Sequence, residues 1–352
     1  MIKTSYYQDL TKMNTFGMKV KARCFMEYDS VADLVDIEFE ELARPVLHIG
    51  GGSNLLFTDD FKGTVLHSKI NFIEILDECQ CIPEAPSHSV MVSVGAGVVF
   101  DDFCEWAAKE GLWGVENLSH IPGEVGASAV QNIGAYGVEV KDVIRKVYCY
   151  DTLEEEFVHF DVEECGYGYR DSIFKDPEIK GRYIVTHVVF ALSREPMPKL
   201  DYGHLKDAVD AAGSDLTPSL IRKVIIRIRK EKLPEPSAVG SAGSFFKNPV
   251  ISAEHFARIE AAAKAESGSD YKVPHYDLPD DMIKVPAAWM IEQCSWKGRR
   301  SGGAAVWEKQ PLVIVNYTGE AYPEEITGLE KRIISSVKAK FGVDLHPEVE
   351  HI

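Results

Sequence analysis

Three consecutive glycines, Gly50 to Gly52, directly follow the apolar segment 45–49 and lead into Ser53 and Asn54. This pattern predicts a buried strand that ends in a turn, where glycine permits positive φ and lets a ligand approach the backbone closely. Successive N–H groups in such a turn form a concavity that suits a pyrophosphate. A plain tight turn is the alternative on this motif alone. The pattern matches neither the Rossmann fingerprint nor a P-loop.

A second glycine-rich segment spans residues 121–137 and contains few bulky side chains. Because such a composition is poorly suited to core packing, we expect an extended backbone there, without regular secondary structure. Such a backbone can lie along a flat ligand and offer N–H and C=O groups to a ring edge. The pyrimidine edge of an isoalloxazine ring alternates donors and acceptors in a matching way, so the segment favours a flavin.

The composition excludes several classes of protein. The net charge of -17 over 352 residues makes nucleic acid a poor partner, although a local cluster of arginines can still bind a small anion. No apolar run approaches the ~18 residues of a membrane span, and residues 1–9 do not resemble a signal peptide. Seven cysteines without a C-x-x-C pair predict a cytoplasmic protein with no disulfide framework and no metal site.

The length of 352 residues predicts two or three domains. A helix that begins after Asp29 or Ser30 and includes Leu42 is expected to form a βαβ unit with strand 45–49, and a further strand follows at 63–67. Short strands are expected over residues 71–200. The other predicted elements are helices at 101–112, 218–232, 252–265, 286–295 and 323–341, and a strand at 311–315.

Six segments in this order resemble the UDP-N-acetylenolpyruvoylglucosamine reductase (MurB) family: residues 14–17, 50–54, 121–137, 168–175, 243–249 and 347–349. The resemblance covers the chain from about residue 14 onward. It implies a combined α/β and α+β fold. The two parts of an FAD-binding region of the vanillyl-alcohol-oxidase (PCMH-type) superfamily would be residues 1–72 and 73–232. An α+β substrate-binding domain would span 233–343, and the tail 344–352 would return to the flavin site.

The resemblance implies a UDP-N-acetylmuramate dehydrogenase of peptidoglycan precursor synthesis. Such an enzyme binds FAD non-covalently, takes hydride from NADPH, and reduces UDP-N-acetylglucosamine enolpyruvate to UDP-N-acetylmuramate. The hydride is added to the enolpyruvyl CH2, and the α-carbon is then protonated. We expect a monomer whose partners are these two small molecules, with neither nucleic acid nor membrane.

Hydride addition places enolate-like charge on the substrate carboxylate, so the site needs positive charge and hydrogen-bond donors. Arg170 supplies a charged fork that matches a carboxylate. By resemblance, Ser244 delivers the proton to the α-carbon, and Glu348 assists in protonated form, which burial would favour by raising its pKa. Taken singly, each residue also has a structural explanation: an ion pair with Asp171, a turn cap, or a solvated carboxylate.

The resemblance also assigns the binding residues. The cofactor-binding residues would be Gly50, Gly51, Gly52, Ser53, Asn54, Pro122, Gly123, Val125, Gly126, Asn132, Gly134, Ala135 and Tyr136. The substrate-binding residues would be Tyr169, Tyr202, Arg229, Lys232, Asn248 and Gln293. Arg229 and Lys232 would reach the diphosphate, whereas Arg222, Lys223 and Arg227 are expected to form a solvated helix face. Residues 199–205 resemble the tyrosine loop of the longer type of this enzyme, and Tyr202 would cover the sugar nucleotide.

Three departures from the family pattern concern local geometry: Ala129 replaces a frequent proline, Glu350 replaces a frequent arginine, and the tail ends at Ile352. Two other functions remain as alternatives. An FAD-linked oxidase or dehydrogenase of the same superfamily often tethers its flavin covalently, for which His120 is a candidate, but it has no use for the three predicted catalytic residues. A nucleotide-sugar-binding protein without flavin does not explain the two glycine segments.

Overall fold

A computed structural model describes residues 1–76, 89–213 and 215–352 of the chain. These residues form two compact units, each assembled from separate stretches of sequence. The first unit contains residues 1–10, 20–52 and 60–230, and the second contains 11–19, 53–59 and 231–352. The predicted domain boundary at 232 stays a prediction, as does the further division at 72.

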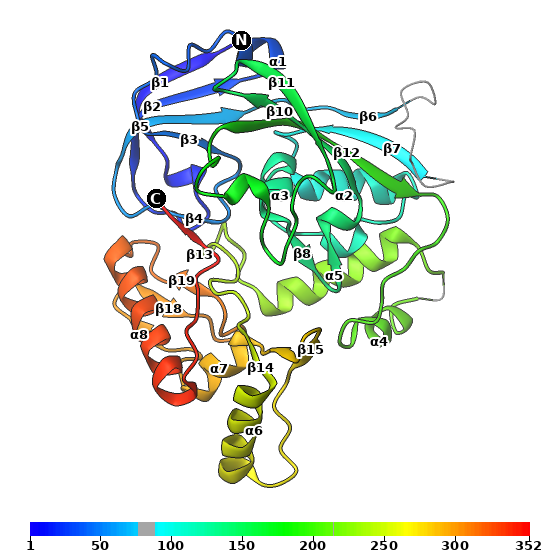
Figure 1. The fold of residues 1–352 in the computed structure, drawn as a ribbon, viewed down its shortest axis with the longest axis vertical. Coiled ribbons are helices and arrows are strands. Elements are labelled where there is room, and N and C mark those ends of the chain that lie inside the picture. The colour runs from blue at the N-terminus through cyan, green and yellow to red at the C-terminus, as the bar shows by residue number, and fades with distance from the viewer. Residues whose placement is uncertain (77–88, 214) are drawn as a thin grey trace. The chain divides into compact units, whose positions relative to one another are not determined.

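A four-stranded sheet opens the first unit, in the order β1-β2-β5-β3 (Figure 1). Its strands are β1 (Lys3–Asp9), β2 (Lys21–Tyr28), β5 (Phe61–Ser68) and β3 (Val46–Ile49). β2 and β3 both run parallel to β5, and helix α1 (Val31–Val35) follows β2, so the βαβ expectation is confirmed with β5 between the two strands. The helix is shorter than predicted, however, and Leu42 lies outside it. Ser30 caps it by accepting the Asp33 N–H at 3.1 Å.

A five-stranded antiparallel sheet completes the first unit, in the order β11-β10-β12-β7-β6. The strands are β11 (Glu156–Asp161), β10 (Ile144–Asp151), β12 (Tyr183–Ser193), β7 (Ser89–Gly95) and β6 (Ile73–Ile75). Helices α2 (Phe100–Lys109) and α3 (Val125–Gln131) cover one face of this sheet (Figure 1). Phe103 of α2 packs on Phe190 of β12, with ring centroids 4.7 Å apart, so the core of the unit lies between helices and sheet.

The segment 121–137 differs from its prediction, because α3 occupies its middle. Only the short hairpin of β8 (Gly134–Ala135) and β9 (Val138–Glu139) is extended, and it turns at Tyr136 and Gly137 with φ of 50° and 79°. The small residues do serve packing: a Cβ on Gly126 would lie 2.9 Å from the Cβ of Ala96. Small side chains therefore let the helix approach the sheet closely. A closely packed helix of this kind and an open loop have the same small-residue composition, so composition alone does not tell them apart.

Three further elements surround this hairpin: the 3₁₀ turn η3 (Glu116–Leu118), α4 (Leu205–Asp210) and α5 (Pro218–Lys232). α5 begins at Pro218 as predicted, and it buries Ile221, Val224 and Ile225 against Trp113. Two further 3₁₀ turns of the same length as η3 lie in the described part of this unit: η4 (Val140–Asp142) and η5 (Ile173–Lys175).

The second unit combines two small sheets with helices. One sheet has the order β13-β19-β18-β17 and the other β14-β16-β15. The strands are β13 (Gly240–Ser241), β19 (Ile314–Asn316), β18 (Ala304–Val306), β17 (Arg300–Ser301), β14 (Val250–Ser252), β16 (Met282–Lys284) and β15 (Tyr276–Leu278). The helices are α6 (Ala253–Ser267), α7 (Ala287–Gln293), α8 (Pro323–Phe341) and the 3₁₀ turn η1 (Thr11–Met13). The three predicted α-helices are confirmed. The strand expected at 311–315 begins only at Ile314, because Pro311 and Leu312 form a turn.

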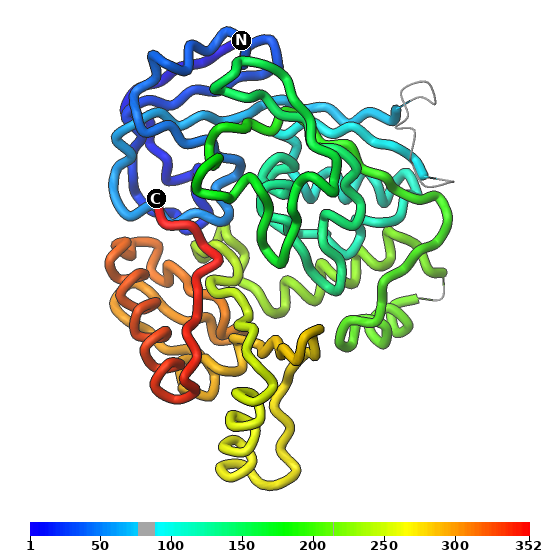
Figure 2. Tube along the Cα trace, in the orientation of Figure 1, coloured from blue at the N-terminus to red at the C-terminus, as the bar shows by residue number. Residues whose placement is uncertain are grey.

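The tail belongs to the second unit and forms a parallel pair of very short strands there. β20 (Glu350–His351) pairs with β4 (Leu55–Leu56), and Figure 2 shows the red tail ending beside the blue trace that contains these partners. Across the described residues, no helix combines the length and apolar character that a membrane span requires.

Candidate active site

The two predicted glycine segments meet in the first unit. A Cβ on Gly50 would lie 3.2 Å from both the Cβ of Ala127 and a carboxylate oxygen of Glu124. A Cβ on Gly51 would lie 3.5 Å from the Cα of Gly123, and Gly52 has a φ of 61°. The turn after β3 therefore packs against the beginning of α3. The turn contributes only backbone atoms to this contact, because its residues are glycines.

This turn fits an anionic group that is held by backbone. Within the described residues, the N–H groups of Gly51 and Gly52 donate to no other atom, and Gly51 is partly exposed. Unpaired N–H groups in a glycine turn bind oxyanions such as a pyrophosphate. The residues that the sequence predicts for FAD therefore suit its diphosphate.

A buried set of ionisable side chains lies beside the turn, and sequence reasoning missed it. His67 is only 3% exposed, and its two ring nitrogens contact Glu27 at 3.1 Å and Glu124 at 2.9 Å. Glu27 and His67 are paired residues on the parallel strands β2 and β5. The register between β2 and β5 places Glu27 beside His67 and would have identified this set of residues. That register cannot be read from the sequence before the order of strands in the sheet is known.

Arg170 lies at the tip of a tight turn, beside the β8–β9 hairpin. Gly168 and Asp171 exchange backbone hydrogen bonds of 3.0 and 3.2 Å, and Arg170 has a φ of 55°. Its Nη2 donates to the carbonyl of Gly134 at 2.6 Å. The Asn132 amide donates to the Gly168 carbonyl at 2.8 Å. The structure thus brings Arg170, Asn132 and Gly134 together.

Tyr136, Tyr202 and Arg229 also lie together in the first unit. The rings of Tyr136 and Tyr202 meet edge to face, with centroids 6.0 Å apart. Arg229 hydrogen-bonds the hydroxyl of Tyr136, and its Nε donates to the His120 carbonyl at 3.1 Å. Burial lowers the pKa of Arg229 and raises the pKa of Tyr136, so both groups are partly withdrawn from water.

Arg222 is not part of a solvated helix face, contrary to the prediction. Its side chain is 12% exposed and forms an ion pair with Asp101, in which Nη2 and Oδ2 lie 3.1 Å apart. Asp101 also accepts the N–H of His120, which has a φ of 61°. Burial alone would raise the pKa of Asp101, but the hydrogen bonds from Arg222 and His120 outweigh it and lower the pKa. Lys223 and Arg227 are exposed, as expected.

Ser244 and Glu348 lie on adjoining backbone segments of the second unit. Ser244 is exposed, follows Gly243 (φ 71°) and precedes the buried Phe245. The Glu348 N–H donates to the Phe245 carbonyl at 2.8 Å, and the Phe245 N–H donates to the Leu312 carbonyl at 2.8 Å. The predicted proton donor and the predicted acid are thus held next to each other by main-chain bonds. Leu312, which the sequence did not single out, fixes the other side of this segment.

Asn54 anchors the tail at Glu348. Its Nδ2 donates to the Glu348 carbonyl at 3.1 Å, and its own carbonyl accepts the Glu350 N–H at 2.9 Å. Farther along, the Ile352 N–H donates to the Leu56 carbonyl at 2.9 Å. The short tail with Glu350 therefore forms an ordered ladder.

The remaining predicted substrate residues of the second unit lie apart from this ladder or serve structural bonds. Asn248 accepts the Ala287 N–H at 2.9 Å and thereby caps α7. Lys232 is exposed at the end of α5, and its carbonyl accepts the Trp307 indole N–H at 3.1 Å.

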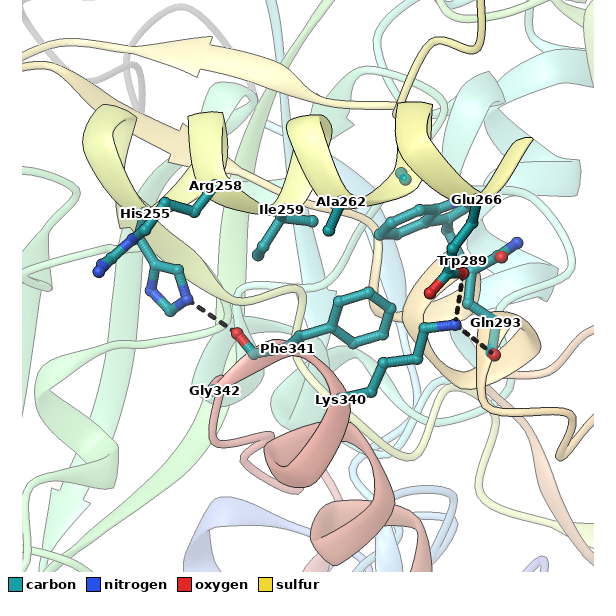
Figure 3. A pocket seen from close by; sticks show the side chains of 11 residues that line it. His255, Arg258, Ile259, Ala262, Glu266, Trp289, Gln293, Lys340, Phe341 and Gly342 are labelled. Carbon is teal, nitrogen blue, oxygen red and sulfur yellow. Dashed lines mark hydrogen bonds and ion pairs between the residues drawn. The ribbon is translucent and has the colours of Figure 1, made fainter. Parts of the chain in front are cut away.

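Gln293 lines a pocket of about 440 Å³ between α6, α7 and the end of α8 (Figure 3). None of the other predicted site residues lines this pocket. Trp289 forms one of its walls and is buried, as is Trp296. Among the described residues, no group of three His, Cys, Asp or Glu side chains is arranged to hold a metal ion.

Two protein families match separate parts of the chain. Residues 23–159 match the FAD binding domain family, and residues 235–352 match the UDP-N-acetylenolpyruvoylglucosamine reductase C-terminal domain. These matches confirm the predicted succession of an FAD-binding region and a C-terminal domain of this type.

Curated relatives match nearly the whole length. The chain is 48% identical over 344 residues to the UDP-N-acetylenolpyruvoylglucosamine reductase of Bacteroides fragilis strain YCH46, covering 97% of this chain and 98% of the relative. It is 43% identical over 348 residues to the reductase of Porphyromonas gingivalis strain ATCC 33277, covering 97% of each. The solved reductase (MurB) of Thermus caldophilus has the same fold, with a TM-score of 0.64 and 23% identity, covering 100% of this chain and 98% of that one. These matches show that the chain belongs to the UDP-N-acetylenolpyruvoylglucosamine reductase family.

Proposed function

We propose that this protein reduces UDP-N-acetylglucosamine enolpyruvate to UDP-N-acetylmuramate, with non-covalently bound FAD and with NADPH as the reductant. The observation that carries the proposal is the pairing of the Ser244 and Glu348 segments through the hydrogen bond from the Glu348 N–H to the Phe245 carbonyl. It presents an alcohol and a carboxyl group from adjoining segments, as protonation of a substrate carbon requires. The flavin, when bound, supplies a centre that accepts a hydride and passes it on.

Two glycine-containing segments hold the cofactor in this proposal. Gly50 to Asn54 bind the diphosphate through backbone N–H groups, and Pro122 to Tyr136 lie along the flavin ring. The unpaired N–H groups of Gly51 and Gly52 support this assignment. The helical form of Val125–Gln131 limits the extended contact to the residues on either side of α3.

Arg170 binds the substrate carboxylate and stabilises the negative charge that develops on it. Its Nη2 donates to the Gly134 carbonyl, which fixes the guanidinium beside the β8–β9 hairpin. Glu348 contributes a proton or a hydrogen bond to the same charge. Ser244 protonates the α-carbon, which is basic enough in the enolate to take a proton from an alcohol.

The residues that the resemblance assigns to the substrate bind the sugar nucleotide in this proposal. Arg229 and Lys232 bind the diphosphate, and Tyr169, Asn248 and Gln293 make further contacts. Tyr202 covers the substrate from its exposed loop. Arg229 supports this part most directly, because its positive charge is half-buried next to Tyr136 and Tyr202. We expect the enzyme to work as a cytoplasmic monomer.

Separate half-reactions test the proposal. Ser244→Ala is expected to leave anaerobic reduction of the flavin by NADPH nearly intact, because no carbon is protonated in that step. Reoxidation by the enolpyruvyl substrate should fall by about 10²–10⁴-fold. Ser244→Cys keeps a protonated side chain of similar size and should retain more of that rate. Equal loss in both half-reactions would make Ser244 a structural residue.

Two simpler measurements test the rest of the assignment. NADPH consumption should depend on added UDP-N-acetylglucosamine enolpyruvate. Acid precipitation should leave a colourless pellet and a yellow supernatant, because the flavin is not covalently attached. A yellow pellet would instead favour a superfamily oxidase with a tethered flavin.

A further inference from the structure

Asn117 joins two segments to which the proposed function gives different tasks. It is the middle residue of η3 and is 1% exposed. Its single amide nitrogen donates to the Tyr136 carbonyl at 2.9 Å and to the Lys199 carbonyl at 2.8 Å. Tyr136 belongs to the hairpin assigned to the flavin, and Lys199 begins the loop that carries Tyr202. One side chain therefore links the two.

The two acceptors fix the orientation of this amide. If the group were rotated by half a turn, its oxygen would face two carbonyl oxygens, so the NH2 must point toward Tyr136 and Lys199. The oxygen itself is buried and has no partner among the described residues. An unsatisfied buried oxygen costs free energy, and a smaller or apolar residue would avoid that cost. The presence of asparagine at position 117 is therefore explained by the two carbonyl groups that its NH2 group binds.

Hydrogen bonds hold the backbone turn that carries Asn117. The neighbouring Glu116 is buried, and its carboxylate accepts the Gly114 N–H at 2.6 Å. Ser119 closes the same turn by donating its hydroxyl to the Glu116 carbonyl at 2.7 Å. Because the turn is bonded on both sides of Asn117, the amide has a fixed position in the first unit.

The held segments differ in how freely they can move. Tyr136 is fixed by its strained φ of 50°, by Arg229 at its hydroxyl and by Asn117 at its carbonyl. Tyr202 is 46% exposed, and it is followed by Gly203 with a φ of 56°. The Tyr202 loop is thus tied at the Lys199 carbonyl. Backbone rotation is least restricted at Gly203, four residues after Lys199.

We infer that Asn117 is a positioning residue, which ties the base of the Tyr202 loop to the flavin hairpin so that Tyr202 closes over the sugar nucleotide against the ring of Tyr136. The inference rests on the proposed function, in which Tyr202 covers the substrate. Asn117 itself touches neither substrate nor cofactor in this scheme. It lowers the cost of ordering the loop when the nucleotide binds.

The first test is the kinetics of Asn117→Ala in the FAD-loaded enzyme. Loss of both hydrogen bonds should raise the KM for UDP-N-acetylglucosamine enolpyruvate about tenfold and change kcat little. Asn117→Asp has nearly the same shape but no NH2, and it should show the same loss. Ser119→Ala is the matched control, because it loosens the same turn without touching the loop, and its KM should stay near that of the wild type. An unchanged KM in Asn117→Ala would overturn the inference.

A double-mutant cycle asks whether Asn117 acts through Tyr202. Once Tyr202→Ala has removed the covering ring, adding Asn117→Ala should raise KM no further, so the two effects should not add. Additive effects on KM would mean that Asn117 acts by another route and would also overturn the inference.

Limited trypsin digestion of the holoenzyme without substrate separates this inference from the proposed function. The bond after Lys199 should be cut about tenfold faster in Asn117→Ala than in the wild type or in Ser119→Ala, because its carbonyl is no longer held. Equal cleavage rates would refute the tether. If wild-type enzyme fails to reduce the enolpyruvyl substrate, the proposed function fails, whereas the cleavage result still decides whether the tether exists.

Discussion

The Gly50–Gly52 turn of the first unit and the backbone ladder that joins the Ser244 and Glu348 segments of the second unit are built in different ways. At the turn, Gly50 and Gly51 pack against residues 123–127, and the fit depends on side chains that are absent. At the ladder, Ser244 and Glu348 lie on irregular segments that are joined by main-chain hydrogen bonds. The turn therefore depends on the absence of side chains that would clash. The ladder depends on which backbone N–H group is paired with which carbonyl group.

This difference predicts how each region tolerates change. An added side chain at the turn competes with either the protein or the ligand for space. A changed side chain on the ladder leaves the backbone bonds in place, so its effect should be confined to the chemistry that the side chain performs. The ladder should instead be sensitive to the few side chains that fix its register, of which Asn54 is one.

The largest effect is expected from Gly51→Val, which should abolish flavin retention while the apoprotein still folds. A Cβ at this position meets only the Cα of Gly123, at an ordinary 3.5 Å, but the branched side chain blocks an approaching diphosphate. Gly126→Val should behave differently and reduce folding itself, because its Cβ would collide with Ala96 at 2.9 Å. Flavin absorbance per protein and the Tm of each apoprotein distinguish the two. A fully yellow Gly51→Val protein would place the diphosphate elsewhere.

Side-chain replacements on the catalytic groups should come next. Glu348→Gln should lower kcat by about 10²–10³-fold with KM little changed, because its proton or hydrogen bond meets charge that is absent from the bound substrate. Arg170→Ala should lower kcat and also raise KM, since the substrate carboxylate is anionic from the start. Steady-state kinetics at matched flavin content provide the measurement. Wild-type turnover by Glu348→Ala would remove Glu348 from the mechanism.

Asn54→Ala should have a smaller effect and tests the ladder itself. It removes the hydrogen bond to the Glu348 carbonyl, which is worth about 1 kcal/mol, so we expect kcat to fall about fivefold with normal flavin content. Thr58→Val is the matched control: its hydroxyl donates to the Ile352 carbonyl at 2.7 Å, at the far end of the same ladder. If both variants lose kcat equally, the ladder responds as a whole and Asn54 has no special place in it.

The smallest effect is expected in the pH dependence of the unfolding free energy that the Asp101–Arg222 ion pair contributes. Asp101 also accepts the N–H of His120 and so supports the loop there. The folded pKa of Asp101 lies below its ordinary value of 3.8, so the stability that the carboxylate adds is complete above that value. It is lost as pH falls through the lower folded pKa. The difference in unfolding free energy between wild type and Asp101→Asn should therefore narrow as the solution is acidified below about pH 4. Asp102→Asn, at the exposed neighbouring position, controls for the loss of one negative charge from the start of α2.

The sequence predicted the regular elements better than their contacts. Helices such as α5 and α8 were found because proline marks their starts and apolar residues recur at helical spacing. The helix α3 was missed, because small residues that allow close packing have the same composition as an open loop. Its partner Ala96 is distant in sequence, and nothing local identifies it.

The candidate site shows the same limit. The Gly50–Gly52 turn was predictable, since its glycines are contiguous. The contacts of His67 with Glu27 and Glu124 depend on strand register, and the pair of Asp101 and Arg222 joins residues 121 positions apart. The roles of Ser244 and Glu348 came from family resemblance alone, because an exposed serine and a partly buried glutamate carry no local signal.

The bonds from Asn54 and Thr58 to the tail each join residues 294 positions apart. During synthesis at about 5–20 residues per second, segment 53–59 therefore waits about 15–60 s for its partners to be made. The residues around it that belong to the first unit can fold in the meantime. A nascent chain can thus acquire its FAD-binding fold well before Glu348 exists, and the capacity to hold a cofactor precedes the capacity to use it.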